Sequence, residues 1–414
     1  MNQRAVGIVA SVVMALVCWR GAVADDGLLN RLVDENTYDL KGDDEKVGGS
    51  GLKFLLEATA DAQFFCFAEP HNVNLVPPIF TGLFEALQRQ HGFHYVALET
   101  GPVVLERAGR APARGDRQAI DRLFGAYPKS FHFYTDEELQ MIADVGRLST
   151  AENAPLWGVD QVHGTQMVLD ELNEATSDEA ARAKIEELVQ EVRQFERQRG
   201  RRRDFLKQDH DAFARLHDAL APQAGSRGQF LVDQLRVSWR IYRDYFRAQD
   251  GEPTGYASNC RREENMKSLF MHYYREAEAT GDGLPKVMLK SGHWHLMKGA
   301  SPGHCYTLGT FVMDLAKSNG LSSFHLMVSV VNEGENASSI TKYPEYAPIT
   351  RAGSANRWVV VDLRPLRGYL YAGKLGDVHA ELRHWIYSYD AVLMIGGTTG
   401  GHYVTDVKRR FGKL

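Results

Sequence analysis

Short apolar runs alternate with amphipathic stretches along most of this chain, and this alternation restricts its fold more than any other feature. Seven runs of four to seven residues have the length and composition of buried strands: 64–68, 95–98, 156–159, 286–289, 324–330, 358–361 and 392–395. Helical patterns follow several of them, including 77–90 and 137–148. Strands that alternate with helices predict an α/β fold, with a mainly parallel β-sheet covered by helices on both faces.

One long stretch, from Gln166 to Ala279, interrupts this alternation. It contains no run with the character of a strand, and apolar residues such as Ile185, Leu188 and Val192 recur at the three- and four-residue spacing of an amphipathic helix. We therefore expect a helical insertion, 165–280, within a single domain, and we expect it to cover part of the functional site. The basic residues 199–203 have acidic neighbours, so we interpret them as a solvated helix face or turn rather than an anion site.

The first 24 residues have the pattern of a secretory signal peptide. Residues 1–4 carry one positive charge, 5–19 form an apolar run, and 22–24 read Ala-Val-Ala, which fits a small-x-small cleavage site. The apolar run is short for a membrane span. We therefore expect cleavage after Ala24, a mature chain of 25–414, no stable membrane anchor, and a periplasmic or secreted location.

The charge of the mature chain argues against nucleic acid as a partner. Removing residues 1–24 deletes two arginines and no acid, so 46 basic residues remain against 53 acidic ones, a net charge of about −7. Phosphate binding requires a basic face instead. Of the remaining cysteines, Cys66 lies in an apolar run and is expected to be a buried thiol. An oxidising compartment would allow Cys260 and Cys305 to pair.

Ionisable residues follow four of the expected strands. They are Glu69 and His71 after the first strand, Glu99 after the second, Asp160 after the third, and His293 and His295 after the fourth. In an open parallel sheet, ligands bind beyond the carboxyl ends of the strands. Taken singly, most of these residues have a structural interpretation; Asp160, for example, serves equally well as a helix cap. Together they predict one functional site.

The chain lacks the motifs of several common enzyme classes. It has no G-x-S-x-G elbow, no H-E-x-x-H helix and no G-x-x-x-x-G-K-[ST] loop, which argues against a serine hydrolase, a zincin and a P-loop enzyme. Histidine with carboxylates suits general-base activation of water, because imidazole titrates near neutral pH and a carboxylate can orient it. On an extended segment, His293 and His295 would point to the same side, one as a catalytic and the other as a supporting residue.

Several segments resemble the erythromycin esterase-like family, and they occur in the family's order. They are residues 68–87 followed by GFHYVALET, then YPKSFHFYTDEELQMIADVGRL, WGVDQ, NCRREENMKSLF and KSGHWHLMKG, with YDAVLMIGGTTGGH as a last strand. The resemblance implies a hydrolase that uses water rather than a serine nucleophile. By position it implies His71 as the general base, organised by Glu69 and Glu99. It also implies that Arg262 and His295 contact the substrate or the developing oxyanion, and we assign Asp160 and His293 to substrate binding.

Two departures separate the chain from macrolide esterases of that family. Glu69-Pro70-His71 is one residue shorter than the family's Glu-x-x-His, and Ala68 replaces the usual glycine. The shorter spacing is more similar to that of the related ChaN-like haem-binding proteins. The leading hypothesis is a hydrolase that cleaves a small-molecule ester or lactone without a cofactor.

Two alternatives remain open at this point. One is a ChaN-like haem- or iron-binding protein without turnover, with a ligand from among His71, His293 and His295. The other is a metal-dependent hydrolase with a ligand set of Glu69, His71, Glu99 and His295, whose imidazole and carboxylate donors would suit several metals. Arg262 and the two glutamates favour the cofactor-free hydrolase, because a haem site has no evident need for that guanidinium.

Overall fold

The computed structural model describes residues 27–42, 47–110, 113–152, 154–199, 225–281, 283–332 and 339–404. The expected signal peptide, 1–24, and residues 200–203 of the basic cluster lie outside the described residues. Within the described ranges, no helix combines the length and the apolar character that a membrane span requires.

One sheet runs through the molecule, and the described strands have the order β2-β1-β8-β9-β7-β3-β6-β4-β5. Their bounds are β1 Thr37–Gly42, β2 Val47–Gly48, β3 Ala62–Glu69, β4 Tyr95–Leu98, β5 Leu156–Gly158, β6 Val287–Gly292, β7 Ser322–Val330, β8 Trp358–Asp362 and β9 Ala391–Ile395. The strands from β9 to β5 in this order are parallel. At the other edge β8, β1 and β2 pair antiparallel. The predicted mainly parallel α/β sheet is confirmed.

Sequence patterns missed β1 and β2 at the antiparallel edge. In β1 only Leu40 is buried, so this edge strand lacks the apolar run by which the other strands were predicted. β2 has two residues and pairs with β1 alone. Edge strands of this kind face water along much of their length, so they carry little hydrophobic signal.

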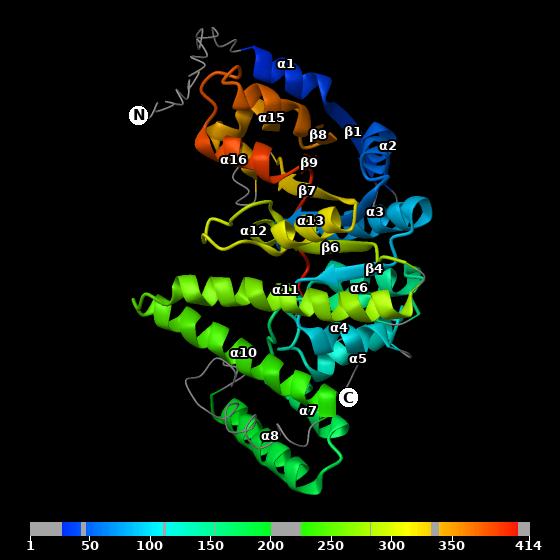
Figure 1. The fold of residues 1–414 in the computed structure, drawn as a ribbon, viewed down its shortest axis with the longest axis vertical. Helices are drawn as coiled ribbons and strands as arrows, with labels where there is room; N and C mark the ends of the chain where they lie inside the picture. The colour runs from blue at the N-terminus through cyan, green and yellow to red at the C-terminus, as the bar shows by residue number, and fades with distance from the viewer. Residues whose placement is uncertain are drawn as a thin grey trace, which may run out of the picture.

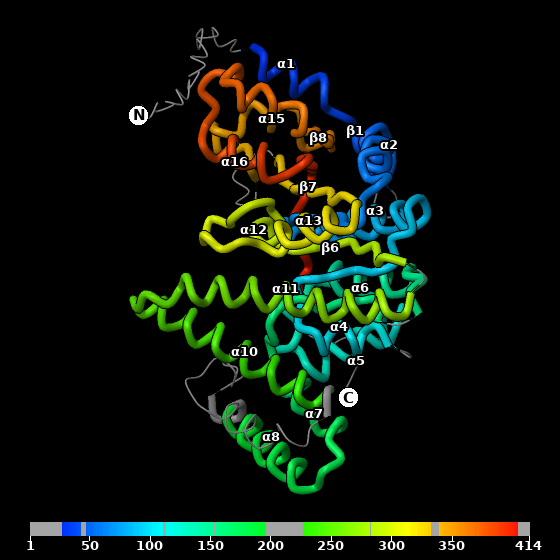
Figure 2. Tube along the Cα trace, viewed as in Figure 1, coloured from blue at the N-terminus to red at the C-terminus, as the bar shows by residue number. Residues whose placement is uncertain are grey.

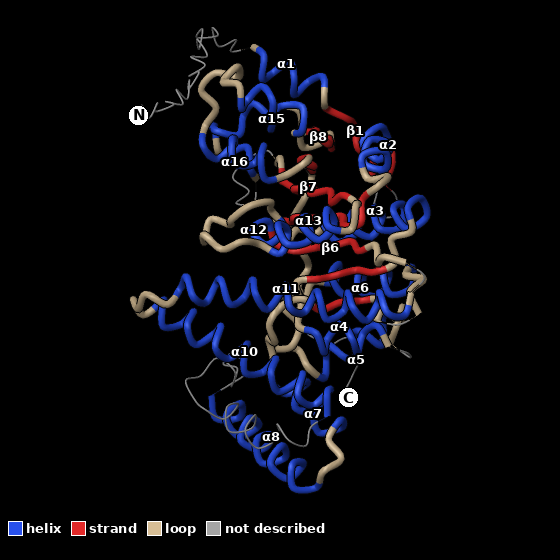
Figure 3. The backbone as a smooth tube through the Cα atoms, in the orientation of Figure 1, coloured by secondary structure: helices blue, strands red, loops and turns tan. Residues whose placement is uncertain are grey.

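Helices cover both faces of the sheet. As a result β3 is buried along its whole length, and its side chains alternate between two hydrophobic cores. Phe65 and Phe67 belong to one core, together with helices α2 Gly49–Ala58, α3 Val76–His91 and α6 Asp136–Leu148. Phe64 and Cys66 belong to the other, together with α11 Gly255–Thr280, α13 Leu308–Ser318 and α16 Ala380–Ser388. Figure 3 shows the strands stacked through the middle of the molecule with helices around them.

Shorter helices complete the two layers. They are α1 Leu28–Glu35, α4 Pro102–Gly109, α5 Arg117–Ala126, α12 His293–Leu296, α14 Ala347–Thr350 and α15 Arg364–Tyr371, with 3-10 turns at η2 Ile340–Lys342 and η3 Pro344–Tyr346.

The described residues between β5 and β6 form helices joined by loops and turns, with no strand. These helices are α7 Thr165–Ala175, α8 Glu179–Arg199, α10 Gly225–Gln249 and α11. Figures 1 and 2 show α11 beside the sheet layers, with α10 and α8 extending away from them. Glu106 links α10 and α11 to α4, because it accepts a hydrogen bond of 2.7 Å from Tyr273 of α11 and pairs with Arg227 of α10. A disulfide between Cys260 and Cys305 further attaches α11 to the loop before α13.

The strand order explains why the ionisable residues meet. β3, β6, β4 and β5 are neighbours and all run in the same direction. Their carboxyl ends therefore lie side by side at one edge, which is where ligands bind in open parallel sheets.

Candidate active site

Glu69 and His71 form a hydrogen-bonded pair at the end of β3. Nδ1 of His71 lies 3.0 Å from Oε1 of Glu69, whose side chain is 1% exposed. An ionised carboxylate only accepts hydrogen bonds, so Nδ1 donates and Nε2 carries the lone pair of the neutral ring. Glu69 does not cap the helix that follows, because α3 begins after Leu75 and has no side-chain cap. The pair therefore presents a base at Nε2.

A gap separates this base from Glu99, which follows β4. Nε2 of His71 lies 3.8 Å from Oε2 of Glu99, too far for a direct hydrogen bond. Both atoms are acceptors when His71 is neutral, so a water molecule that donates to each would bridge them. Gly292 borders this space: a Cβ added there would lie 2.8 Å from His71 Nε2 and 3.5 Å from Glu99 Oε2. Glycine at 292 therefore keeps the gap open.

Buried charges hold both carboxylates ionised. Burial alone would raise the pKa of Glu99, but His295, Arg262 and His71 outweigh it and hold that pKa well below its usual range. Oε2 of Glu99 also accepts hydrogen bonds of 2.7 Å from the Gly292 amide and 2.8 Å from the hydroxyl of Ser291. Glu99 thus stays anionic beside His71 at neutral pH.

Lys290 is the buried cation that keeps Glu69 ionised. Its side chain is 3% exposed, and Nζ lies 3.0 Å from Glu69 and 2.7 Å from Glu138. Burial would raise the pKa of Glu69, but Lys290 and the hydrogen bond with His71 outweigh it and lower that pKa. Glu138 behaves differently, because burial raises its pKa more than Lys290 lowers it.

His71 responds to the two carboxylates around it. Burial would lower its pKa, but the hydrogen bond to Glu69 and the charge of Glu99 outweigh burial and raise it above 6.5. The ring of Phe133 lies against His71, with 4.7 Å between the ring centroids, and 36% of the His71 side chain remains exposed. His71 is thus held in place, with a proton affinity suited to a base near neutral pH.

Arg262 of α11 provides a cation at the same edge. Its Nε and Nη2 donate to the two oxygens of Asp160 at 2.9 and 2.7 Å, and Nη2 also donates to Glu99 at 2.7 Å. Nη1 makes no hydrogen bond to a described residue, and the side chain is 23% exposed. One nitrogen of the guanidinium is therefore available to a substrate. Asp160 serves Arg262 and is not a helix cap, since α7 begins after Gly164.

His295 lies on the same side as Arg262. Its Nε2 is 3.5 Å from Glu99, and its Nδ1 is 2.6 Å from Glu263, which accepts a further hydrogen bond from the Leu308 amide. Burial and Arg262 would lower the pKa of His295, but Glu99 and Glu263 outweigh them and raise it. The imidazolium form of His295 is thereby favoured.

His293 points elsewhere, and the prediction that it would share a side with His295 is wrong. The segment is not extended: α12 begins at His293, and residues two apart on a helix differ by about 200° in direction. Nε2 of His293 donates to the Val328 carbonyl at 2.8 Å. Burial lowers the pKa of His293 to about 4. Its observed contact is structural, so only its position in the chain supports a role in substrate binding.

The structure therefore brings together six of the seven predicted site residues, namely Glu69, His71, Glu99, Asp160, Arg262 and His295. Sequence reasoning missed Lys290, Glu138, Glu263, His132, His163 and Tyr242. Lys290 carried a usable signal, because a lysine inside the apolar run VMLKSG must be paired when buried. The other five had no such signal.

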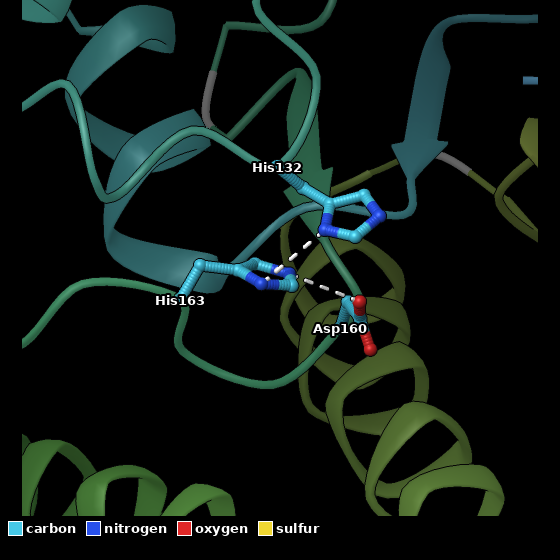
Figure 4. A group of neighbouring side chains, drawn as sticks. All are labelled: His132, Asp160 and His163. Carbon is cyan, nitrogen blue, oxygen red and sulfur yellow. Dashed lines mark hydrogen bonds and ion pairs between the residues drawn. The ribbon is translucent and has the colours of Figure 1, made fainter. Parts of the chain in front are cut away.

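One group of described side chains, His132, Asp160 and His163, is close enough to share a metal ion (Figure 4). The donor atoms of Asp160 and His163 are already engaged, however. Arg262 occupies both oxygens of Asp160, and the hydroxyl of Tyr242 lies 2.8 Å from Nδ1 of His163. Hydrogen bonds within the protein thus account for this arrangement.

The end of the described chain fixes the two loops that border the base. The amide of Gly401 donates to the Asn72 carbonyl at 2.8 Å, next to His71. The amide of Asp136 donates to the His402 carbonyl at 2.8 Å, close to Phe133. Residues 399–404 therefore hold the loops of His71 and Phe133 in register with each other.

The sequence matches no family model and no curated protein, whereas three solved structures resemble the fold. A protein from Bacillus cereus is 13% identical, with 92% of this chain and 99% of that chain covered and a TM-score of 0.56. A succinoglycan biosynthesis protein is 14% identical, with 90% and 97% covered and a TM-score of 0.54.

The third structure is a mutant of the erythromycin esterase EreC in its open conformation. It is 14% identical to this chain, with 86% of this chain and 95% of that chain covered and a TM-score of 0.54. At identities this low, the comparisons show likeness of fold alone. This likeness extends over nearly the whole chain. This protein therefore has the erythromycin esterase-like fold.

Proposed function

We propose that this protein is a hydrolase that cleaves an ester or lactone with a water molecule activated by His71. The observation that carries the proposal is the position of Nε2 of His71, whose ring is oriented by Glu69, at 3.8 Å from Oε2 of Glu99 and next to Gly292. This arrangement supports a water molecule bound between a base and an anion. The likeness of fold to an erythromycin esterase supports the choice of an ester bond.

The proposed reaction needs one proton acceptor and one group of cationic donors. Water attacks the substrate carbonyl while Nε2 of His71 removes its proton, and Glu69 stabilises the resulting imidazolium. The negative oxygen of the tetrahedral intermediate receives hydrogen bonds from Nη1 of Arg262 and from His295. When the intermediate collapses, the leaving alkoxide takes the proton from Nε2, which restores the base.

The same contacts argue against haem or metal ligation by these residues. Nδ1 of His71 is bonded to Glu69, Nδ1 of His295 is bonded to Glu263, and Nε2 of His293 is bonded to a carbonyl. Lys290 and Arg262 already neutralise the carboxylates that a metal ion would need. We therefore propose that no cofactor takes part and that the partner is a small-molecule ester or lactone.

We further propose that the mature protein is periplasmic or secreted and has no membrane anchor. The pattern of residues 1–24 supports export. The disulfide between Cys260 and Cys305 supports an oxidising compartment.

The test is a panel of ester and lactone substrates, offered to the mature chain with and without a strong chelator. We expect hydrolysis of at least one substrate, unchanged after chelation, and no haem absorbance on reconstitution. Activity that is lost on chelation and restored by a divalent ion would favour the metal-dependent alternative. A stable haem complex without hydrolysis would favour the haem-binding alternative.

A further inference from the structure

The disulfide between Cys260 and Cys305 joins the two segments that supply the cationic side of the site. Cys260 lies near the start of α11, two residues before Arg262 and three before Glu263. Cys305 lies in the loop that runs from α12, which carries His295, to the start of α13. The two cysteines are 45 residues apart in the sequence. The bond thus links covalently two segments that each contribute groups to the site.

Glu263 is the point at which these two segments meet. Its carboxylate is buried, with Oε1 at 2.6 Å from Nδ1 of His295. Its Oε2 accepts a hydrogen bond of 2.9 Å from the Leu308 amide at the start of α13. Hydrogen bonds weaken steeply when distance and angle change. The contact between Glu263 and His295 therefore depends on the spacing between α11 and the loop that contains Cys305.

The start of α13 also packs against the backbone beside His295. A Cβ added at Gly309 would lie 2.4 Å from the carbonyl group of Leu296, the residue that follows His295. The hydroxyl of Thr307 donates a hydrogen bond to the Met297 carbonyl. A displacement of the loop would therefore move the backbone that carries His295.

The other features of this loop favour the disulfide as the bond that sets the spacing. Nζ of Lys267 donates to the carbonyl of Tyr306, but Tyr306 is 70% exposed, and water competes for a hydrogen bond at such a position. His304, next to Cys305, has a φ of 60°, a conformation that persists only where the surroundings impose it. Covalent attachment of the neighbouring residue supplies such a constraint.

We propose that the disulfide between Cys260 and Cys305 positions Glu263 and His295 for the reaction, so that the enzyme is fully active only in its oxidised form. Cys305 is buried and Cys260 is half-buried, so a thiolate of a dithiol would attack Sγ of Cys260 and release Cys305. The second thiol of the reagent then releases Cys260. Two electrons and two protons pass to the two cysteines, and the dithiol becomes a cyclic disulfide. This inference rests on the proposed hydrolase function.

The first test is reduction of the folded mature chain with dithiothreitol, well below its thermal midpoint. Alkylation and mass spectrometry count the thiols released, and hydrolysis of the best ester is followed. Misplacing a reacting group by about 1 Å can lower a rate about a hundredfold. We therefore expect kcat to fall about ten- to a hundredfold, KM to stay within a few-fold, and reoxidation to restore kcat. Unchanged kcat in the fully reduced, folded protein would overturn the proposal.

A double variant, Cys260→Ser with Cys305→Ser, controls for other effects of the reagent. It should have the kcat of the reduced wild type, and dithiothreitol should not change it further. A double variant with the kcat of the oxidised wild type would also overturn the proposal.

A matched variant separates positioning from a general loss of stability, because losing a disulfide also destabilises a fold. Leu29 of α1 is buried at a distance from α11 and α12 (Figure 1). Leu29→Ala should lower the thermal midpoint by leaving a cavity, and kcat should not change. A loss of kcat in Leu29→Ala equal to that on reduction would show that stability alone is responsible.

A double-mutant cycle tests whether the disulfide acts through Glu263. Glu263→Gln should lower kcat in the oxidised protein. Reduction of this variant should then cause little further loss, because the contact that the disulfide maintains is already weakened. Independent losses that multiply would refute Glu263 as the connection.

Failure of the hydrolase function would be recognised separately, because the oxidised protein would then hydrolyse no ester of the panel. In that case the proton NMR signal of the Nδ1 hydrogen of His295 decides. It should appear downfield in the oxidised protein, be absent from Glu263→Gln, and disappear on reduction. A signal that persists in the reduced protein, or is missing from the oxidised one, would refute the positioning role of the disulfide.

Discussion

Replacing Gly292 by alanine should abolish water activation without disrupting the fold. The added Cβ would lie 2.8 Å from Nε2 and 2.9 Å from Cε1 of His71, and 3.5 Å from Oε2 of Glu99, so it would displace the ring of the base. The backbone at Gly292, with φ −55° and ψ 152°, is open to alanine, so no backbone strain arises. The nearest atom belongs to a side-chain ring that can move, so the base should shift rather than the fold unfold.

The expected loss in kcat is about a hundred- to ten-thousand-fold, the usual contribution of a positioned general base. KM should change less, because Arg262 and the rest of the substrate contacts remain. The assay is steady-state hydrolysis of the best ester in the panel, together with thermal unfolding to confirm that the variant folds.

Gly368→Ala is the matched control for this substitution. Gly368 is exposed within α15, and a Cβ there would meet nothing within 4 Å. Alanine in a helix should stabilise the protein by about 0.5–1 kcal/mol and leave kcat unchanged. A fully active Gly292→Ala enzyme would show that the water does not occupy the gap, and would refute the reasoning.

Three further predictions concern the charges of the site. The ratio kcat/KM should rise with pH through an apparent pKa above 6.5. Activity needs neutral His71, and the neighbouring carboxylates raise the pKa of its ring. A flat profile from pH 5 to 9 would contradict this prediction. Arg262→Lys should lower kcat about a hundredfold by removing the Nη1 donor, and unchanged kcat would exclude Arg262 from oxyanion binding. Lys290→Met should destabilise the fold by about 3 kcal/mol at pH 7, measured by guanidinium unfolding, because it leaves two buried carboxylates without their cation. That destabilisation should shrink as the pH falls, because Glu69 without Lys290 becomes protonated more readily. Exposed Lys53→Met should change stability by less than about 0.5 kcal/mol.

The strands around the site were predictable because each is buried on both faces. β3 and β6 are apolar runs with a polar residue at the end, so both the strand and the position of its carboxyl end can be read from the sequence. The convergence of Glu69 and Glu99 follows from parallel pairing alone. The antiparallel edge was not predictable in this way, because β1 buries only Leu40.

Most residues that set the charge state of the site could not be predicted from the sequence. Glu263 lies one position after Arg262 in a charged helix, where nothing in the sequence separates a buried acid from a solvated one. His132 comes from a loop that is hydrogen-bonded to the end of the described chain, a long-range contact that the local sequence does not reveal. The directions of His293 and His295 depended on whether the segment was helical or extended, which four residues cannot specify.

The most direct test of the account is the turnover of His71→Asn on the best ester. Asparagine keeps a planar polar group beside Glu69 but cannot take a proton from water near neutral pH. The account predicts that kcat falls by about a hundred- to ten-thousand-fold, while KM stays within a few-fold of the wild-type value and the thermal midpoint changes little. Wild-type turnover in His71→Asn would contradict the assignment of the general base.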